Sequence, residues 1–290
     1  MNSKKFFNDA LVLLGHGSTK NADSDSSVLL HASELRRRKI FAEVQAAFWK
    51  QDPHIKKVLA VLTAPRIFIV PMFVSDGYFS DEIIPRELGF QASRITYHAS
   101  QARYYCGAIG THDSMTNVIL ARACDVVAQF PFPRQPRQHE TTLIIAGHGT
   151  EKNSDSRKPI ERQVELIRAM NLFADVHAVF MEEEPRIGAC LDLAETRNIV
   201  VVPFFISDGL HVQEDIPVML GEPESIVKQR MKAGRPTWRN PTEKKGKLIW
   251  YSKSIGSDPH IAEVILERVR EACTPQSEEV KLENSKIKKD

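Results

Sequence analysis

Short apolar runs alternate with longer amphipathic stretches along the chain. In the second half of the sequence, the apolar runs cover residues 142–146, 174–180 and 199–205, and the amphipathic stretches cover residues 159–170 and 186–197. The apolar runs are rich in Val, Ile and Phe and lack strict alternation, as is typical of strands buried on both faces of a sheet. Strands that alternate with segments of helical length predict βαβ units, and therefore an α/β fold with a mainly parallel sheet flanked by helices.

The second half of the sequence repeats the first half. Residues 11–89 align with residues 143–221 at a constant offset of 132, and 29 of the 79 paired positions are identical. Residues 108–122 align with residues 254–268 at an offset of 146, so the second copy holds 14 additional residues between these two matches. The chain is therefore an internal duplication.

This duplication sets the expected domains. We expect an N-terminal lobe over residues 1–130, a proline-rich linker over 131–140, a C-terminal lobe over 141–274 and a polar tail over 275–290. Each copy should end with a fourth strand, near residues 95–98 in the first copy and 248–252 in the second, followed by a helix.

Composition narrows the class of protein. A chain of 290 residues with 42% hydrophobic and 26% charged residues suits two globular domains. No apolar stretch approaches the ~18 residues that span a membrane, so we expect a cytoplasmic protein without a membrane partner. A net charge of +2 does not by itself indicate nucleic acid. The four cysteines form no CxxC pair, which favours buried reduced thiols over a zinc or iron–sulfur site.

Two histidines are expected at one edge of the second sheet. His148 lies in a Gly-His-Gly tripeptide directly after an apolar run, and His211 follows the apolar run that ends at residue 205. Because open α/β sheets bind ligands at the carboxyl ends of their strands, the two imidazoles should converge. Two neutral imidazoles with open coordination positions suit a divalent metal such as cobalt, iron, nickel or zinc. For the tripeptide alone, a simple strand-to-loop turn is the alternative.

The two copies differ at three polar positions. The second copy has His177, Glu182 and His211 at the positions of Gln45, Lys50 and Phe79. Both copies keep the histidine of the Gly-His-Gly tripeptide, which is His16 in the first copy. A polar residue present in one copy alone indicates chemistry that the other copy has lost. We therefore predict that the second copy is the active one.

Three residues near these histidines have two interpretations each. Glu182 could accept a proton or act as a third metal ligand, or it could belong to a solvated acidic run with its two glutamate neighbours. Asp215, four residues after His211, could orient that imidazole or cap a helix. His177 lies within a strand, so a structural role is favoured over ligation.

The additional residues of the second copy contribute to a basic segment. It holds Trp238 together with Lys228, Arg230, Lys232, Arg235, Arg239, Lys244, Lys245 and Lys247. Basic residues interleaved with an aromatic ring can hold a flat anionic partner, either a polycarboxylate macrocycle or nucleic acid; a solvated loop is the alternative. The sequence has no GxxxxGK[ST] and no GxSxG motif, which argues against P-loop nucleotide hydrolysis and a serine hydrolase.

The two histidine motifs together resemble those of the CbiX/SirB sirohydrochlorin chelatases of the class II chelatase superfamily. The motifs are Gly-His-Gly-Thr at residues 147–150 and Pro-Phe-Phe-Ile-Ser-Asp-Gly-Leu-His-Val-Gln-Glu-Asp-Ile-Pro at residues 203–217, and the resemblance spans both copies. It implies two fused chelatase-like (flavodoxin-like) lobes with a tetrapyrrole cleft, and it implies that His148 and His211 bind the metal. Phe79 stands where the first copy would need its second histidine.

The resemblance also implies a reaction. The chain would insert Co²⁺, or alternatively Fe²⁺, into sirohydrochlorin without ATP, in cobalamin or sirohaem synthesis, with the metal as a substrate and no nucleotide cofactor. His148 and His211 would hold the metal, Glu182 would accept pyrrole protons, and Arg230, Arg235 and Arg239 would meet the carboxylates of the macrocycle.

The expected partner is the tetrapyrrole and not nucleic acid, and the chain would be a monomer or a homodimer. A non-enzymatic metal or tetrapyrrole carrier is the alternative, and a sensor that binds a small anion is a third. Catalytic turnover distinguishes a chelatase from a carrier.

Overall fold

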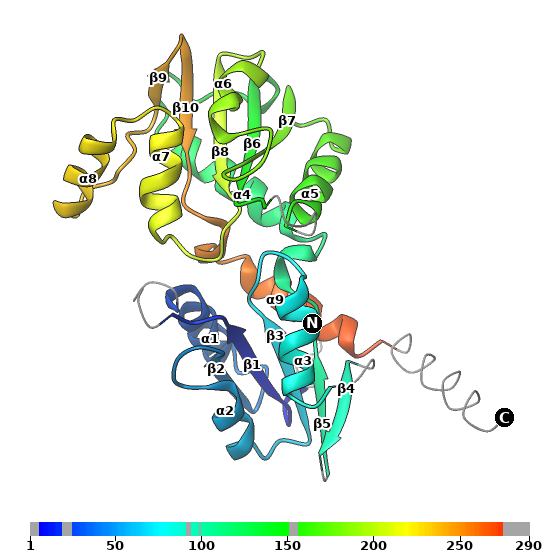
Figure 1. The fold of residues 1–290 in the computed structure, drawn as a ribbon. Coiled ribbons are helices and arrows are strands. Elements are labelled where there is room, and N and C mark those ends of the chain that lie inside the picture. The colour runs from blue at the N-terminus through cyan, green and yellow to red at the C-terminus, as the bar shows by residue number, and fades with distance from the viewer. Residues whose placement is uncertain (1–5, 19–24, 91–93, 99, 151–155, 275–290) are drawn as a thin grey trace. The chain divides into compact units, whose positions relative to one another are not determined.

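The chain folds into two compact units. The computed structural model describes residues 6–18, 25–90, 94–98, 100–150 and 156–274, so the expected polar tail lies outside the described residues. One unit comprises Met1–His112 and Ala262–Asp290, and the other comprises Asp113–Ile261. Each contains a five-stranded sheet flanked by helices (Figure 1). No helix among the described residues is long and apolar enough to cross a membrane.

The sheet of the first unit has the strand order β2-β1-β3-β5-β4. Its strands pair in parallel, except for the antiparallel edge pair β4–β5. The strands are β1 (Ala10–Gly15), β2 (Glu43–Phe48), β3 (Arg66–Pro71), β4 (Ile95–His98) and β5 (Gln101–Tyr105). The helices are α1 (Ser26–Arg38), α2 (Ile55–Val61), α3 (Ile84–Glu87) and all but the first residue of α9 (Ile261–Ala272).

The second unit has the same topology, with the strand order β7-β6-β8-β10-β9. Only the edge pair β9–β10 is antiparallel among the pairings of the described strands. The strands are β6 (Thr141–Gly147), β7 (Asp175–Phe180), β8 (Asn198–Pro203), β9 (Thr242–Lys244) and β10 (Lys247–Tyr251). The helices are α4 (Met115–Gln129), α5 (Lys158–Ala169), α6 (Cys190–Leu193), α7 (Ile216–Met219) and α8 (Glu224–Lys232). The duplication of the sequence is thus a duplication of the fold.

The predicted α/β fold is confirmed, but each sheet has one strand that was not predicted, β5 in the first unit and β9 in the second. The apolar runs of the second copy form β6, β7 and β8 within one to two residues of their predicted bounds. In the first copy, the strand that pairs in parallel with β3 is β5, whereas the predicted strand at residues 95–98 is β4, the antiparallel edge strand. The strand β5 was missed because its sequence, Gln-Ala-Arg-Tyr-Tyr, has two long polar side chains and no aliphatic run.

The compact units do not follow the boundaries of the repeat, because the two copies exchange their terminal helices. Helix α4 ends the first copy but belongs to the second unit, where Arg122 donates to the carbonyl of Ser254 (2.9 Å) and to the hydroxyl of Ser257 (2.8 Å). Helix α9 ends the second copy but belongs to the first unit, where Arg268 donates to the carbonyl of Ala108 (2.7 Å). These two arginines are equivalent in the repeat, so the exchange is reciprocal.

Each sheet is covered on both faces. In the second unit, α4 and α5 lie on one face and α6 and α7 on the other (Figure 1). The core on the α6–α7 face includes Ile216, Ile249 and Trp238, each 5% exposed or less. Burial on both faces explains why the central strands are continuous apolar runs. It also leaves the loops at the strand ends as the places where polar side chains can gather.

Candidate active site

The two predicted histidines meet at the carboxyl edge of the second sheet. His148 follows β6, and His211 begins a short helical segment, η7 (His211–Asp215), after β8. Because β6 and β8 are paired neighbours, the loops after them start side by side. The ring centroids of His148 and His211 are 5.1 Å apart, with the rings inclined at 78°. The structure therefore brings the two imidazoles together as predicted.

Hydrogen bonds orient both imidazoles in the same sense. The Nδ1 atom of His148 lies 2.8 Å from the carbonyl oxygen of Gly149, and the Nδ1 atom of His211 lies 2.6 Å from Oδ2 of Asp215. Carbonyl and carboxylate oxygens accept hydrogen bonds, so Nδ1 is the donor in each ring. Each neutral imidazole then keeps a lone pair on Nε2 for a metal ion. Asp215 takes the predicted orienting role.

The acidic run after β7 divides into three distinct roles. Glu183 accepts from the backbone N–H of Thr150 (3.2 Å) and pairs with Arg157 (3.1 Å). Glu184 is largely exposed, at 78%, and pairs with Arg186. Glu182 is different, because its Oε1 atom lies 3.8 Å from Nε2 of His148. The carboxylate therefore faces the nitrogen that would bind a metal, which a purely solvated run does not explain.

The Gly-His-Gly loop has one conformation in both copies. Gly17 and Gly149 have φ values of 74° and 70°, a left-handed conformation that favours glycine. A Cβ atom on Gly149 would also lie 2.7 Å from Oε1 of Glu183. The backbone needs these glycines irrespective of any ligand, so the tripeptide alone indicates a turn. The second histidine is what turns this edge into a candidate metal site.

The first copy places an aromatic cluster at the equivalent edge. The ring of His16 lies 5.2 Å from that of Phe79, which occupies the position of His211. Phe79 also packs against Trp49 and Phe73, at centroid distances of 5.8 and 6.4 Å. Among the residues that the structure describes in this unit, no second imidazole lies beside His16, and the ring of Phe79 fills that space. The asymmetry predicted between the copies is present in the geometry.

Asp208 is a structural residue of this edge that sequence reasoning missed. Its carboxylate accepts from the backbone N–H of Ser254 (2.7 Å) and from the hydroxyl of Ser257 (2.8 Å). In the first unit, Asp76 accepts from Ala108 and Thr111 in the same way. These bonds anchor the loop that leads to His211. Its identity in both copies is the signal that could have indicated a shared structural role.

His177 and the cysteines, residues of types that often bind metals, take no part in the site. His177 lies in β7 and pairs with Asp175 (2.9 Å), which fits the structural role predicted for it. All four cysteines are free thiols, and burial raises the pKa of Cys106 and Cys190 to about 12. Within the described part of the chain, no cluster of three or more His, Cys, Asp or Glu side chains could hold a metal. The candidate is a two-histidine site with open positions.

Most of the basic segment is engaged within its own unit. Arg230 donates to Glu222 (2.7 Å) and to the carbonyl of Thr237 (2.7 Å), and Lys244 pairs with the same glutamate (3.0 Å). Although burial alone would raise the pKa of the Glu222 carboxyl, hydrogen bonds from Lys244 and Arg230 hold it below its ordinary value. Trp238 is 5% exposed and packs on Tyr251. The predictions that Arg230 meets a substrate and that Trp238 clamps one are therefore corrected: both stabilise the insertion.

Arg235 and Arg239 remain available. Both are exposed, and no hydrogen bond or ion pair within the described part of the chain engages either guanidinium. Arg235 lines a cavity of about 620 Å³ together with Gln213, Lys253 and Tyr251. Because Val212 and Gln213 directly follow His211 and also line this cavity, the cavity adjoins the histidine edge. Arg239 does not line it.

Comparisons with known proteins place the chain in a family. The CbiX family model matches the chain twice, over residues 10–126 and 142–272. The chain is similar to a protein of Halobacterium salinarum described as a "Probable sirohydrochlorin cobaltochelatase", with 39% identity over 93% of this chain and 94% of the relative. It is also similar to the "Sirohydrochlorin cobaltochelatase" of Methanopyrus kandleri, with 32% identity over 45% of this chain and 95% of the relative.

A solved structure shows the same fold. It is described as "SirB from Bacillus subtilis with Fe3+", and the similarity covers 92% of this chain and 96% of that chain, with a TM-score of 0.66 and 19% identity. The M. kandleri relative corresponds to about one of the two copies, whereas the H. salinarum relative matches nearly the whole chain. With two matches of the family model that together span most of its residues, the chain belongs to the CbiX family.

Proposed function

We propose that this chain inserts a divalent metal ion into sirohydrochlorin, with Co²⁺ as the favoured metal and Fe²⁺ as the alternative, and that the reaction needs no ATP. The observation that supports this most strongly is the pair of imidazoles in the second copy, 5.1 Å apart, each with Nδ1 held by a hydrogen bond so that the lone pair of Nε2 is left for a metal. The relatives named as sirohydrochlorin cobaltochelatases support the choice of substrate and metal. Affinity order alone would favour copper, so metal supply and site geometry must select cobalt.

The geometry supports a separate role for each residue of the site. Two imidazoles hold a metal ion through Nε2 and leave other coordination positions open, so that nitrogens of the macrocycle replace bound water one at a time. The macrocycle loses two pyrrole protons as the metal enters. The Glu182 carboxylate, 3.8 Å from Nε2 of His148, is placed to accept a proton there. Asp215 and the carbonyl of Gly149 hold the rings in place throughout.

Turnover tests the proposal directly. Purified protein is incubated anaerobically with sirohydrochlorin and Co²⁺ or Fe²⁺, and the absorbance of the metallated macrocycle is followed with and without ATP. We expect many equivalents of product per protein and no effect of ATP. A single stoichiometric equivalent, retained on the protein, would instead indicate a carrier and would contradict the proposal.

Replacing Glu182 separates proton transfer from metal binding. If its carboxylate accepts macrocycle protons, Glu182→Gln should lower kcat by about 10²-fold or more, the usual contribution of a general base, while metal affinity stays within a few-fold. Stopped-flow turnover and a metal titration measure the two quantities. Glu184→Gln is the matched control, because that carboxylate belongs to the same run but pairs with Arg186. A parallel loss of metal affinity would make Glu182 a ligand, and equal behaviour of both variants would remove it from the mechanism.

Replacing the exposed arginines tests how the carboxylates of the substrate are recognised. We expect Arg235→Gln to raise KM for sirohydrochlorin about 5- to 10-fold with little change in kcat, because a charged contact made equally in ground and transition states affects binding alone. Added salt should reduce the difference from the parent. Arg239→Gln, which removes the same charge outside the cavity, is the control. Equal KM values in the two variants would show that the cavity does not hold the substrate.

A further inference from the structure

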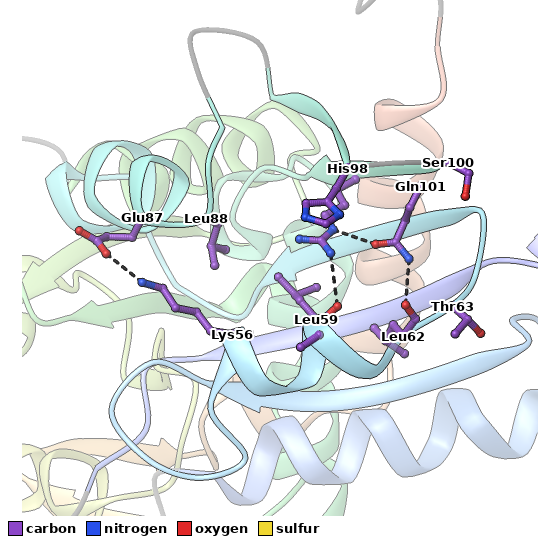
Figure 2. A pocket seen from close by; sticks show the side chains of 11 residues that line it. Lys56, Leu59, Leu62, Thr63, Glu87, Leu88, His98, Ser100 and Gln101 are labelled. Atoms are coloured by element: carbon purple, nitrogen blue, oxygen red, sulfur yellow. Dashed lines mark hydrogen bonds and ion pairs between the residues drawn. The ribbon is translucent and has the colours of Figure 1, made fainter.

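The first unit contains a cavity far from its Gly-His-Gly loop in the fold. It has a volume of about 610 Å³ and lies where the end of α2, the end of α3 and the turn between β4 and β5 come together (Figure 2). These elements lie at the amino end of β5, whereas His16 follows the carboxyl end of β1. The cavity is therefore separate from the edge that corresponds to the candidate active site. Its size is within the range of small-molecule pockets, about 300–1,000 Å³.

One wall of the cavity holds a half-buried arginine, Arg103. Arg103 uses Nε to donate to Oε1 of Gln101 (2.9 Å) and one terminal nitrogen to donate to the carbonyl of Leu59 (3.3 Å). Across the residues that the structure describes, no carboxylate forms an ion pair with it. Burial lowers the pKa of the guanidinium from its ordinary value, as expected for a desolvated cation. Of the five N–H groups of the guanidinium, three remain without a partner in the described structure.

The repeat shows that this arginine is not required by the fold. The pairings of β5 with β3 and of β10 with β8 place Arg103 at the position of Ile249, which is fully buried in the core of the second unit. The position two residues earlier in the strand has the same role in both copies. Gln101 donates to the carbonyls of Leu62 and Ala64, and Lys247 donates to the equivalent carbonyls of Ala194 and Thr196. The same fold thus accepts an isoleucine where the first unit has a charge.

The remaining lining suits an anion that also has an apolar part. Leu59, Leu62 and Leu88 form an apolar side of the cavity, and the hydroxyls of Thr63 and Ser100 lie at its border (Figure 2). The other charged groups of the lining, Lys56 and Glu87, neutralise each other in an ion pair of 3.0 Å. This leaves Arg103 as the uncompensated charge of the described lining. Because a guanidinium binds carboxylates through two parallel hydrogen bonds, its free N–H groups define the preferred head group.

We propose that the cavity beside Arg103 is a binding site for a small organic carboxylate with an aliphatic chain, separate from the metal-insertion site. The carboxylate accepts from the free N–H groups of Arg103, and the chain lies against Leu59, Leu62 and Leu88. The site belongs to the copy that lacks the second histidine, which gives this copy a ligand-binding role of its own.

Titration of the full-length protein with hexanoate tests this site. Two-dimensional NMR of ¹⁵N-labelled arginine side chains should show a saturable shift of the Arg103 Nε–H signal. Arg103→Ile, which installs the residue of the second copy, should weaken binding at least tenfold, and Arg103→Lys should weaken it by an intermediate factor. Arg86→Ile is the control, because it removes an equal charge from α3 outside the cavity lining. Thermal unfolding and metal insertion should be unchanged in both Arg103 variants.

Two further probes separate the contribution of the charge from that of the aliphatic chain. Hexan-1-ol has the chain without the charge, and inorganic phosphate has charge without the chain, so each should bind at least tenfold more weakly than hexanoate. Equal binding of hexan-1-ol, equal binding of phosphate, or unchanged hexanoate binding by a folded Arg103→Ile protein would each overturn the proposal. Since metal insertion is measured separately in the same proteins, failure of this site leaves the proposed chelatase activity untouched.

Discussion

Alanine at His148 or at His211 is expected to lower metal insertion by about 100-fold or more, whereas alanine at His16 should leave most of the activity. Groups that only orient a metal ligand contribute about 10–100-fold, so loss of the ligand itself should cost at least as much. His148 and His211 face each other at 5.1 Å, while His16 faces Phe79 at 5.2 Å. Initial rates of cobalt insertion into sirohydrochlorin measure the effect.

The His16 variant is the matched control for this prediction. His16 has the same loop, the same flanking glycines and the same hydrogen bond from Nδ1 to the following carbonyl as His148. Any general disturbance of the Gly-His-Gly turn should therefore appear in both variants. If all three alanine variants lost activity equally, the asymmetry between the copies would be refuted. Cobalt titration of each protein would then show whether the first copy also binds metal.

Much of the fold follows from the sequence because the repeat is a strong constraint. Two copies at a constant offset must share topology, and the apolar runs that form β6, β7 and β8 are strands buried on both faces, which the pattern of residues indicates directly. The convergence of His148 and His211 follows from the same logic, since both come after neighbouring parallel strands. These features depend on local sequence and on a general rule of sheet topology.

The features that the sequence did not predict depend on partners far apart in the chain. The basic segment looked like a free cationic surface, yet Arg230 is paired with Glu222, and Trp238 is buried against Tyr251. Composition counts charges but does not show which of them meet a carboxylate. The exchange of α4 and α9 is another example. Two copies of one helix carry equivalent contact residues, so the sequence alone does not show which sheet each helix covers.

Replacing Gly256 with alanine is expected to destabilise the second unit by roughly 3 kcal/mol or more, an effect at the upper end for overpacked sites. A Cβ atom there would lie 1.8 Å from the backbone oxygen of Ile206, and backbone cannot move aside as a flexible side chain can. The backbone N–H of Gly256 also donates to the carbonyl of Phe205 (2.9 Å). Differential scanning calorimetry should show a Tm lowered by roughly 6–12 °C, at about 2–4 °C per kcal/mol.

Gly188→Ala is the matched control for this change. The nearest atom to a Cβ there is the oxygen of Met219 at 3.4 Å, an ordinary contact, so Tm should stay within about 2 °C of the parent, since such a replacement changes stability by less than about 1 kcal/mol. Gly256 packs against the loop that Asp208 anchors and that leads to His211. Displacement of this loop should therefore lower metal insertion even at temperatures where the variant remains folded. A Gly256→Ala protein with unchanged Tm and full activity would show that the loop after β8 moves aside without cost. The packing of this loop against Gly256 would then not be what fixes the position of His211.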